Sequence, residues 1–337
     1  MNVSKSRRLW AACLTASVVA TGGSVAEAQE TPSAAMLEEV VVSARKREET
    51  LIEVPVAVTA ISAADIEQRG IQSLGDVALY TPGLPYFDSL NSALGTPVVR
   101  GIAQTNLNSP DRNVAVIYGG VYLANLTATN LEILDVDRIE GGKGPQSALY
   151  GRNAFNGAIN YVPAAPAREL TGRVQATVGS DERGEGKLLV SGPFSDTLRG
   201  RLALSYNTFD GSWENTADPG NGLGGYETKN VSGSLEYQPN DALRINLFGF
   251  YTDDQRGPGS YYIYAAQNCG PTGRPLSAVC GPLEARDALA ANPAATGLGR
   301  KVHLESLDIS YDFGPVSLVS QTSYYDAAVD ILTDYDG

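Results

Sequence analysis

Apolar and polar residues alternate along much of the chain after residue 167. The alternation is clearest at 199–207, 231–237, 243–247 and 306–313, and weaker at 171–179, 186–192 and 315–327. A period of two is typical of a β-strand whose two faces meet different environments. The pattern therefore predicts seven antiparallel strands in this half of the chain.

The connections between these segments alternate in length. Short turns are expected at 196–197, 239–241 and 314–315, and longer connections at 210–225 and 253–300. A soluble β-sandwich would show the same alternation of side chains. However, strands of about ten residues, joined by short turns at one edge and long loops at the other, are typical of a membrane β-barrel. In a barrel, the Leu, Ile and Tyr rows would face lipid, and the Ser, Asp and Arg rows would face the lumen.

Residues 51–166 have a different pattern, with short elements of mixed type. A strand is expected at 54–59, and a helix runs from a capping-box-like start at Ser62 to Gly70. A second helix opens at Ser73 and stops before Pro82-Gly83. These elements predict a compact α+β domain.

Further strands and one short helix complete this domain. The strands are expected at 98–100, ending at Gly101, at 114–122 as a hairpin that turns at Gly119-Gly120, and at 158–162, closed by Pro163. The helix is expected at 147–150.

The first residues form an export signal. A basic start at 5–8 precedes an apolar run at 9–20, and Ala26-Glu27-Ala28 matches a cleavage site, with cleavage expected before Gln29. The apolar run is shorter than the about 18 residues that a membrane-spanning helix needs, and no later run reaches that length. We therefore expect a signal peptide at 1–28 and an exported protein.

One segment of residues 29–50 favours an extended backbone. The run 37–44 holds three consecutive valines, and the charged run 45–49 follows it. Because it lies between a small, polar tail and these charges, it cannot bury itself locally. It is a candidate for adding as a strand to the sheet edge of another protein. From spacing alone, the first strand of the next domain is an equal alternative.

The charge balance and the absent motifs narrow the function. The 337 residues carry a net charge of −13, and an acidic chain is a poor partner for nucleic acid. The sequence holds one histidine and neither a G-x-S-x-G nor an H-E-x-x-H motif, so we expect no enzyme, no cofactor and no metal site. Cys269 and Cys280 lie in a Gly/Pro-rich stretch of an exported chain. A disulfide between them is expected, with a metal pair as the alternative.

Four ordered segments resemble the TonB-dependent outer-membrane receptors. The first, 37–44, is similar to the TonB box. The second, 55–84, is similar to the start of the plug domain, and the third, Val98–Ile102, to its strand ending in Arg-Gly. The fourth, 136–162, matches the closing block of the plug and is the most specific. Together these segments cover residues 37 to about 166.

The resemblance implies an α+β plug domain at 51–166 inside an antiparallel transmembrane β-barrel of about 22 strands, of which 167–337 would supply about seven. It also implies a place in the outer-membrane lipid and the import of a small-molecule substrate, most often a ferric siderophore. The C-terminal domain of TonB, with the inner-membrane energising complex, would pair with the box and pull on it. The box residues that would pair are Glu39, Val40, Val41, Val42 and Ser43.

The resemblance further implies roles for plug residues. Those expected to be structural are Arg100, Gly101, Arg138, Glu140, Gly144, Pro145, Gln146, Tyr150, Gly151, Arg152, Asn153 and Gly157. The glycines would permit turns and close backbone approach rather than touch substrate. The charges would pair with barrel-wall carboxylates or with each other, or stay solvated in the lumen. Loops near 84–97 and 103–113 would face outside, so the candidates for substrate contact are Tyr86, Phe87, Gln104, Asn106 and Asn108.

Two departures from the family pattern affect these expectations. Gly141-Gly142-Lys143 stands where the family usually has a larger apolar residue and an arginine, which should loosen that strand. Seven strands cannot enclose a plug, and the chain ends without the family's terminal aromatic strand, so we expect a fragment or a truncated gene product. A transporter is therefore weighed against a plug fragment that only binds TonB. An exported enzyme is disfavoured by the absent motifs.

Overall fold

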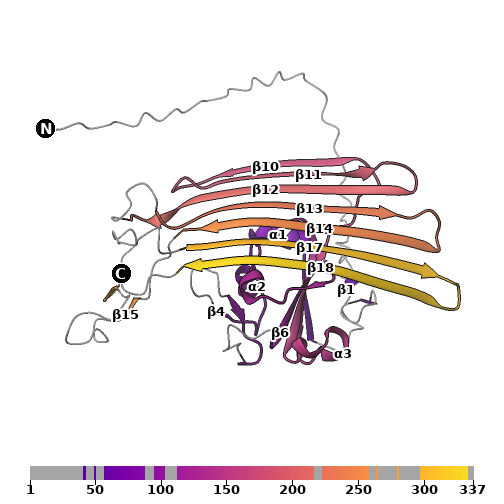
Figure 1. Cartoon of the computed structure of the whole chain (residues 1–337), viewed down its shortest axis with the longest axis horizontal. Helices are drawn as coiled ribbons and strands as arrows, with labels where there is room; N and C mark the ends of the chain where they lie inside the picture. Colours follow the sequence, from indigo (N-terminus) through magenta and orange to yellow (C-terminus); the bar gives the residue numbers. More distant parts are fainter. Residues whose placement is uncertain are drawn as a thin grey trace, which may run out of the picture. The chain divides into compact units, whose positions relative to one another are not determined.

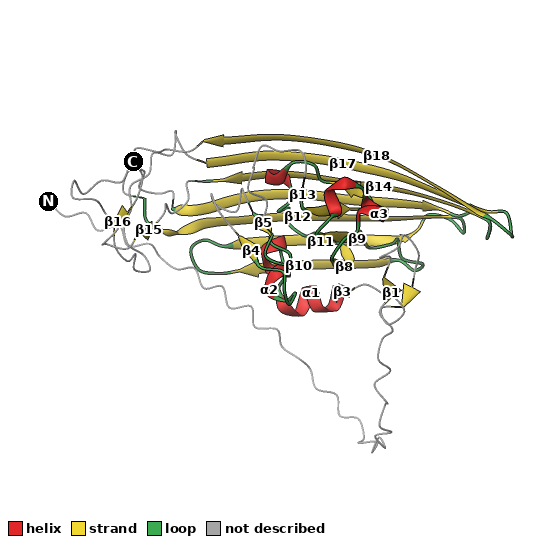
Figure 2. Cartoon of the chain, turned by 90° about the horizontal axis from the view of Figure 1, so that it is seen from below, coloured by secondary structure: helices red, strands yellow, loops and turns green. Residues whose placement is uncertain are grey.

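The computed structural model describes residues 41–42, 49–50, 57–87, 95–102, 112–215, 222–257, 263–264, 279–280 and 297–332. Two larger parts follow each other along the chain. An α+β domain comes first, and a seven-stranded antiparallel sheet, which we call the wall sheet, comes second. The domain lies against one face of the wall sheet (Figure 1, Figure 2).

The wall sheet contains the seven strands that the alternation predicts. In spatial order they are β10 (Thr171–Val178), β11 (Gly184–Pro193), β12 (Leu198–Trp213), β13 (Leu223–Tyr237), β14 (Leu243–Arg256), β17 (Gly297–Asp312) and β18 (Ser317–Leu332). Each strand pairs with its neighbour in antiparallel register. Between β14 and β17, the two-residue strands β15 (Ile263–Tyr264) and β16 (Val279–Cys280) pair in parallel. The open, antiparallel sheet confirms the predicted incomplete barrel.

The strands are longer than the polarity pattern predicts. The connection expected at 210–225 is shorter than predicted, because β12 continues to Trp213 and β13 starts at Leu223. A register shift between Gly211 and Trp213 lets the ladder continue past the alternating segment. The connection expected at 253–300 is likewise shorter, since β14 ends at Arg256 and β17 starts at Gly297.

The two faces of the wall sheet differ as predicted. Small polar side chains such as Ser205, Asn230 and Thr252 are buried on the face that the α+β domain covers, while apolar side chains such as Leu235 and Leu307 are exposed on the other face. The polar row has aromatic and aliphatic exceptions, including Phe248, Phe250, Val302 and Leu304, which join the hydrophobic core of the α+β domain. These exceptions fix where the domain packs.

The α+β domain is built on a five-stranded sheet. Its order is β3 (Ala57–Ser62), β8 (Val136–Lys143), β9 (Gly157–Pro163), β6 (Val114–Tyr118) and β7 (Val121–Tyr122). Only β6 and β9 pair in parallel. The hairpin at Gly119-Gly120 is confirmed, and both glycines have positive φ angles. β8 runs unbroken through Gly141 and Gly142 and stays paired on both sides, so the expected loosening is wrong.

The two first helices begin and end where the capping residues predict. α1 (Ala63–Arg69) starts at Ser62, whose hydroxyl accepts a hydrogen bond from the backbone of Asp65, and ends at Gly70 with a φ of 63°. α2 (Leu74–Leu79) starts at Ser73 with a full capping box. Shorter elements are η1 (Leu126–Ala128), α3 (Ser147–Tyr150) and η2 (Arg152–Ala154). No helix in the described ranges is long and apolar enough to cross a membrane.

The strand predicted at 98–100 is not formed. A two-residue strand, β5 (Thr96–Pro97), pairs instead with β4 (Tyr86–Phe87). After β5 the chain turns sharply. An isolated β-bridge joins Val99 to Ile102, and the φ angles are 53° at Arg100 and 77° at Gly101. Two successive left-handed residues make a tight turn and cannot continue a strand.

Candidate functional site between the domain and the wall sheet

An aromatic cluster joins the α+β domain to the wall sheet. Tyr118 at the end of β6 stacks on Tyr161 of β9 with ring centroids 5.4 Å apart. The same ring lies 5.8 Å from Phe248 and 5.0 Å from Phe250, both on β14. Such pairs add to the free energy of burial when their geometry is offset or tilted. The cluster therefore anchors the β6–β7 hairpin on the sheet.

The two-glycine turn allows this close approach. A Cβ atom on Gly119 would lie 2.5 Å from the ring of Phe248, and one on Gly120 would overlap the side-chain amide of Gln321 on β18. Both positions also have left-handed φ angles, 56° and 81°. The turn therefore brings the backbone of the domain into close contact with the sheet.

A buried ion pair lies next to this cluster, since the hydroxyl of Tyr118 donates to the carbonyl oxygen of Leu134 at 2.7 Å. Asp135 faces Arg201 of β12, whose Nε donates to Oδ2 at 2.7 Å and whose Nη2 binds the other carboxylate oxygen. The side chains are 5% and 16% exposed. A paired, two-point contact of this kind fixes orientation as well as distance. Asp135 itself has a left-handed φ of 56°.

Glu132 binds the wall sheet through neutral donors. The hydroxyl of Ser205 donates to one oxygen at 3.3 Å, and the amide of Asn230 donates to the other at 2.9 Å. Asn230 also donates to Ser205 at 2.8 Å, so the three side chains form a small network. Burial raises the pKa of Glu132 above its ordinary value, and the hydrogen bonds only partly oppose that shift.

A third contact joins the η1 turn to the long strands. Arg300 of β17 pairs with Asp254 of β14 at 2.7 Å, and both side chains are 1% exposed. A second guanidinium nitrogen of Arg300, Nη1, donates to the carbonyl oxygen of Thr127 at 2.7 Å. Thr228 and Arg256 complete the surroundings of Asp254, at 2.7 Å and 3.0 Å. Residues 126–135 are therefore fastened to the wall sheet at three separate points.

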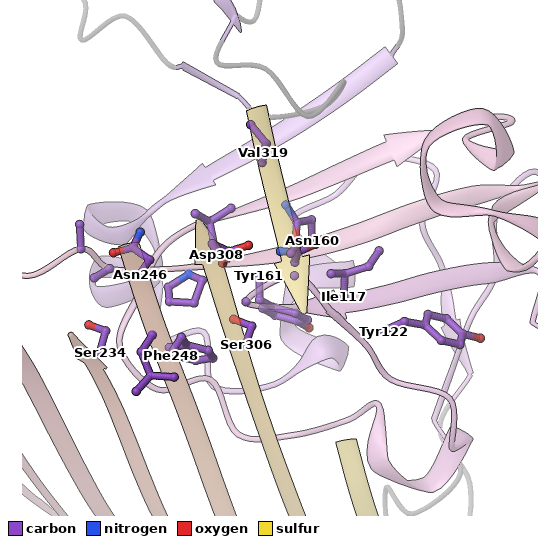
Figure 3. A pocket seen from close by; sticks show the side chains of 18 of the residues that line it. Ile117, Tyr122, Asn160, Tyr161, Ser234, Asn246, Phe248, Ser306, Asp308 and Val319 are labelled. Carbon is purple, nitrogen blue, oxygen red and sulfur yellow. The ribbon is translucent and has the colours of Figure 1, made fainter. Parts of the chain in front are cut away.

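A cavity of about 850 Å³ lies next to the two-glycine turn. Figure 3 shows side chains of strands β13, β14, β17 and β18 on one side of it and of the α+β domain on the other. The lining side chains from the wall sheet include Ser234, Asn246, Ser306, Asp308 and Gln321. Asp308 is the one ionisable carboxyl group of the described lining, which contains no lysine, arginine or histidine.

The predicted closing block forms a compact turn below β8 and β9. The amide of Gly144 donates to Asn156 and that of Gln146 donates to Ala154, both at 2.8 Å. A Cβ atom on Gly157 would lie 2.6 Å from the carbonyl oxygen of Gly142, so the two paired strands approach closely there. Pro145 is exposed at the start of the turn. Gly151 has a φ of 82° between α3 and η2.

The predicted charges lie near this block. Arg138 binds Glu140 at 2.8 Å and Asp137 at 2.7 Å, and Glu140 accepts from Asn160 at 3.2 Å. The structure thus pairs two predicted charges with each other. The side chain of Arg100 is exposed beside Gly144.

Other predicted residues of the block take separate places. The side chain of Asn153 accepts a hydrogen bond from the backbone of Arg112 at 3.2 Å. Burial raises the pKa of Tyr150 to about 12. The side chain of Arg152 lies outside the described residues.

The predicted substrate contacts are not brought together with the cavity. Phe87 is 63% exposed on β4, and the ring of Tyr86 packs against Gly75 and Gly95. Gln104, Asn106 and Asn108 lie outside the described residues, as does Cys269, so these contacts and the disulfide to Cys280 stay predictions. Among the described residues, no group of three or more His, Cys, Asp or Glu side chains could hold a metal ion.

Part of the predicted TonB box forms a short ladder within the chain. β1 (Val41–Val42) pairs in antiparallel register with β2 (Glu49–Thr50). Glu39, Val40 and Ser43 lie outside the described residues.

The fastening residues were missed in the sequence. Arg201, Asn230 and Ser205 stand in the polar rows, where many similar residues face the same side. Glu132 and Asp135 flank the apolar residues 133–134, which marks them as charges entering a buried segment. That signal identifies the segment, but pairing each charge with its partner across the interface needs the three-dimensional arrangement.

Comparison with known proteins decides what the α+β domain is. The family described as TonB-dependent Receptor Plug Domain matches residues 50–158. This part of the chain is a TonB-dependent receptor plug domain. The plug is followed by the wall sheet, in the arrangement seen in receptor structures of this family.

Similar proteins agree with this assignment. The plug and wall sheet superpose on the ferric yersiniabactin uptake receptor FyuA from Yersinia pestis with a TM-score of 0.66 at 22% identity, over 82% of this chain and 42% of that one. The pesticin receptor of Yersinia enterocolitica is 29% identical over 188 residues, which are 55% of this chain and 28% of the relative. The vitamin B12 transporter BtuB of Vibrio vulnificus is 24% identical over 216 residues, or 63% of this chain and 34% of the relative. The chain therefore spans about a third of the length of these curated relatives.

Proposed function

We propose that the protein carrying this chain is an outer-membrane receptor that imports a scarce solute with energy delivered through TonB. The observation that carries the proposal is the plug domain fastened to the polar face of an antiparallel sheet at Thr127, Glu132 and Asp135. The aromatic and aliphatic side chains Phe248, Phe250, Val302 and Leu304 of the sheet pack into the core of the same domain, so the plug is seated on the sheet by polar and apolar contacts together.

We further propose how the chain is divided and placed. Residues 1–28 are a cleaved signal peptide, 29–50 carry the TonB box, 51–166 form the plug and 167–337 belong to the barrel. The exposed apolar row of the wall sheet contacts outer-membrane lipid, in line with the depth-dependent preference of barrel exteriors for apolar residues.

The substrate is proposed to be a ferric siderophore. The support is that several similar proteins carry such names, among them the ferripyoverdine receptor of Pseudomonas aeruginosa at 26% identity and the ferric yersiniabactin uptake receptor. Vitamin B12 transporters are also among the relatives, so a solute other than a siderophore is the alternative. No reaction on the solute is part of this proposal.

TonB is proposed to pair with the backbone of residues 39–43. The support within the chain is that Val41 and Val42 already adopt a paired, extended conformation. Backbone pairing depends on donors and on φ more than on side chains.

The box proposal predicts that Val41→Pro will lower solute uptake about tenfold or more, while Val41→Ala will leave it within about twofold, because proline removes a donor and restricts its neighbour. Uptake of radioactive iron presented with a panel of siderophores measures both. Equal uptake by the two variants would contradict backbone pairing at this position.

A further inference from the structure

We propose that the exposed face of the wall sheet holds one acyl chain of an outer-leaflet glycolipid of the lipid A type at a fixed position. The inference rests on the proposed placement in the outer membrane, and it goes beyond import because it names a lipid that this sheet binds. The site is a trough of about 810 Å³ on the face that points away from the plug. This volume falls within the range of small-molecule sites.

Two glycines form the floor of the trough. Gly233 of β13 and Gly249 of β14 lie directly opposite each other in the antiparallel ladder. Beyond its chain neighbours, a Cβ atom on Gly233 would meet no described atom closer than 3.7 Å, and one on Gly249 none closer than 4.0 Å. Gly200 on the same face is different, because the ring of Phe194 covers it. The described protein therefore leaves open space above Gly233 and Gly249.

Apolar side chains form the walls of the trough. The pair Val231–Tyr251 lies one row farther from the short turns than the glycines, and the pair Leu235–Leu247 lies one row nearer to them. All four side chains are exposed, by between 39% and 45%, and Leu202 closes the trough at β12. Within a bilayer, association depends on packing contacts, and a chain lying in a trough makes more of them than a chain on a flat row. One acyl chain should therefore be held here in preference to its neighbours.

The opposite end of the trough is polar. Glu305 of β17 lies directly opposite Gly249, and its Oε1 is 3.0 Å from Nε2 of His303. These side chains are 53% and 44% exposed, so both can reach an occupant of the trough. The second carboxylate oxygen of Glu305 can accept hydrogen bonds from hydroxyl groups. An apolar trough with such an end matches an acyl chain whose head group is rich in hydroxyls.

The polar end lies toward the outer surface of the membrane. Short connections of membrane barrels lie on the periplasmic side, and 313–316 is such a connection. Moving away from it along this face of β17, Leu307 is followed by the polar side chains of Glu305, His303 and Lys301. A phospholipid of the inner leaflet would place its head near the short connections instead. A glycolipid of the outer leaflet has its sugar hydroxyls on the side where Glu305 and His303 lie.

The test uses the full-length receptor, purified in detergent and stripped of bound lipid. Two probes are added from mixed micelles: lipid A and a phosphatidylethanolamine with chains of the same length. Gly249→Leu and Gly233→Leu each fill the trough. Gly186→Leu is the matched control, since Gly186 lies on the same face opposite Tyr206 and a Cβ atom there would meet nothing within 4 Å. Native mass spectrometry measures the affinity for each lipid, and heat-modifiable migration shows which variants are folded.

The expected result is that the parent and Gly186→Leu bind lipid A about ten times or more tighter than phosphatidylethanolamine. Gly249→Leu and Gly233→Leu should lower the affinity for lipid A about tenfold, because a side chain occupies the place of the acyl chain. Glu305→Leu should reduce the preference for lipid A and leave the affinity for phosphatidylethanolamine unchanged. Equal affinity of the folded trough variants and the control for lipid A, or no preference for lipid A in the parent, would overturn the proposal.

The two proposals fail in different ways. If removal of the box abolishes uptake but the trough variants bind lipid A as tightly as the parent, the trough proposal is wrong and the import function stands. If uptake does not depend on the box but the trough variants lose lipid A, the import function is wrong and the trough proposal stands.

Discussion

At the scale of single residues, the carboxylates between plug and wall sheet are held in two ways. Asp135 is matched by a guanidinium group, whereas Glu132 accepts hydrogen bonds from neutral side chains. A buried pair contributes little net stability but costs several kcal/mol when one partner is removed. Burial raises the pKa of Glu132, and its hydrogen bonds and the charge of Lys187 only partly oppose that shift. The contact of Asp135 should therefore respond to removal of its partner Arg201, and the contact of Glu132 to a change of pH.

Breaking the buried ion pair should cost more stability than breaking an exposed ion pair between the same two parts of the chain. Arg201→Met should lower the free energy of unfolding by about 3 kcal/mol, because it leaves Asp135 as an uncompensated buried charge. The matched control is Arg173→Met, which breaks the exposed plug–sheet pair with Glu67 and should cost about 1 kcal/mol or less. Denaturant unfolding of the protein in detergent measures both, and similar losses in the two variants would contradict the assigned role.

Glu132 predicts a dependence of stability on pH. Its pKa in the folded protein is raised above the ordinary value of 4.5, so the folded state holds the proton more tightly than the unfolded state. The associated stability is fully present below pH 4.5 and is lost as pH rises through the folded pKa. The melting temperature should therefore fall more steeply above pH 4.5 in the parent than in Glu132→Gln. Parallel curves for the two proteins would show that Glu132 does not titrate in this way.

At the scale of elements, the β6–β7 hairpin determines how closely the plug approaches the sheet. Gly119→Ala should lower the free energy of unfolding by about 2 kcal/mol or more, because the methyl group meets Phe248 and the φ angle is left-handed. Gly83→Ala is the control, since it has a similar φ of 75° but open space around it. Equal melting temperatures of the two variants would show that the close contact between Gly119 and Phe248 does not affect stability.

Local signals in the sequence were sufficient for most elements. Ser62, Ser73 and Gly70 mark helix ends because capping acts within one turn, and alternation marks strands because it records the two faces of a sheet. The polar row ends before the backbone ladder does, so strand lengths were underestimated. The prediction of a strand at Arg100 is wrong because no sequence pattern indicates a left-handed φ angle at an arginine.

The candidate site was less predictable than the fold. The closing block could be located from its resemblance, since its glycines meet backbone of the same domain. The fastening contacts join residues 66 to 173 positions apart, and the polar row offers several equivalent partners for each plug charge. The cavity depends on packing between the plug and four strands, which no local pattern encodes.

At the scale of the whole molecule, a plug domain and a wall sheet meet through separable polar contacts, an aromatic cluster and a cavity. The contacts hold residues 126–135, whereas the proposed TonB box lies far upstream in the sequence. A pull on the box would therefore reach the wall sheet through the plug. We propose that this pull drives import.

The most direct measurement compares solute uptake and surface binding in cells that produce the full-length receptor with and without residues 37–44. We predict that the deletion abolishes uptake and leaves surface binding unchanged, because in the proposed function the box only links the plug to TonB, which delivers the energy. Undiminished uptake after the deletion would contradict the account.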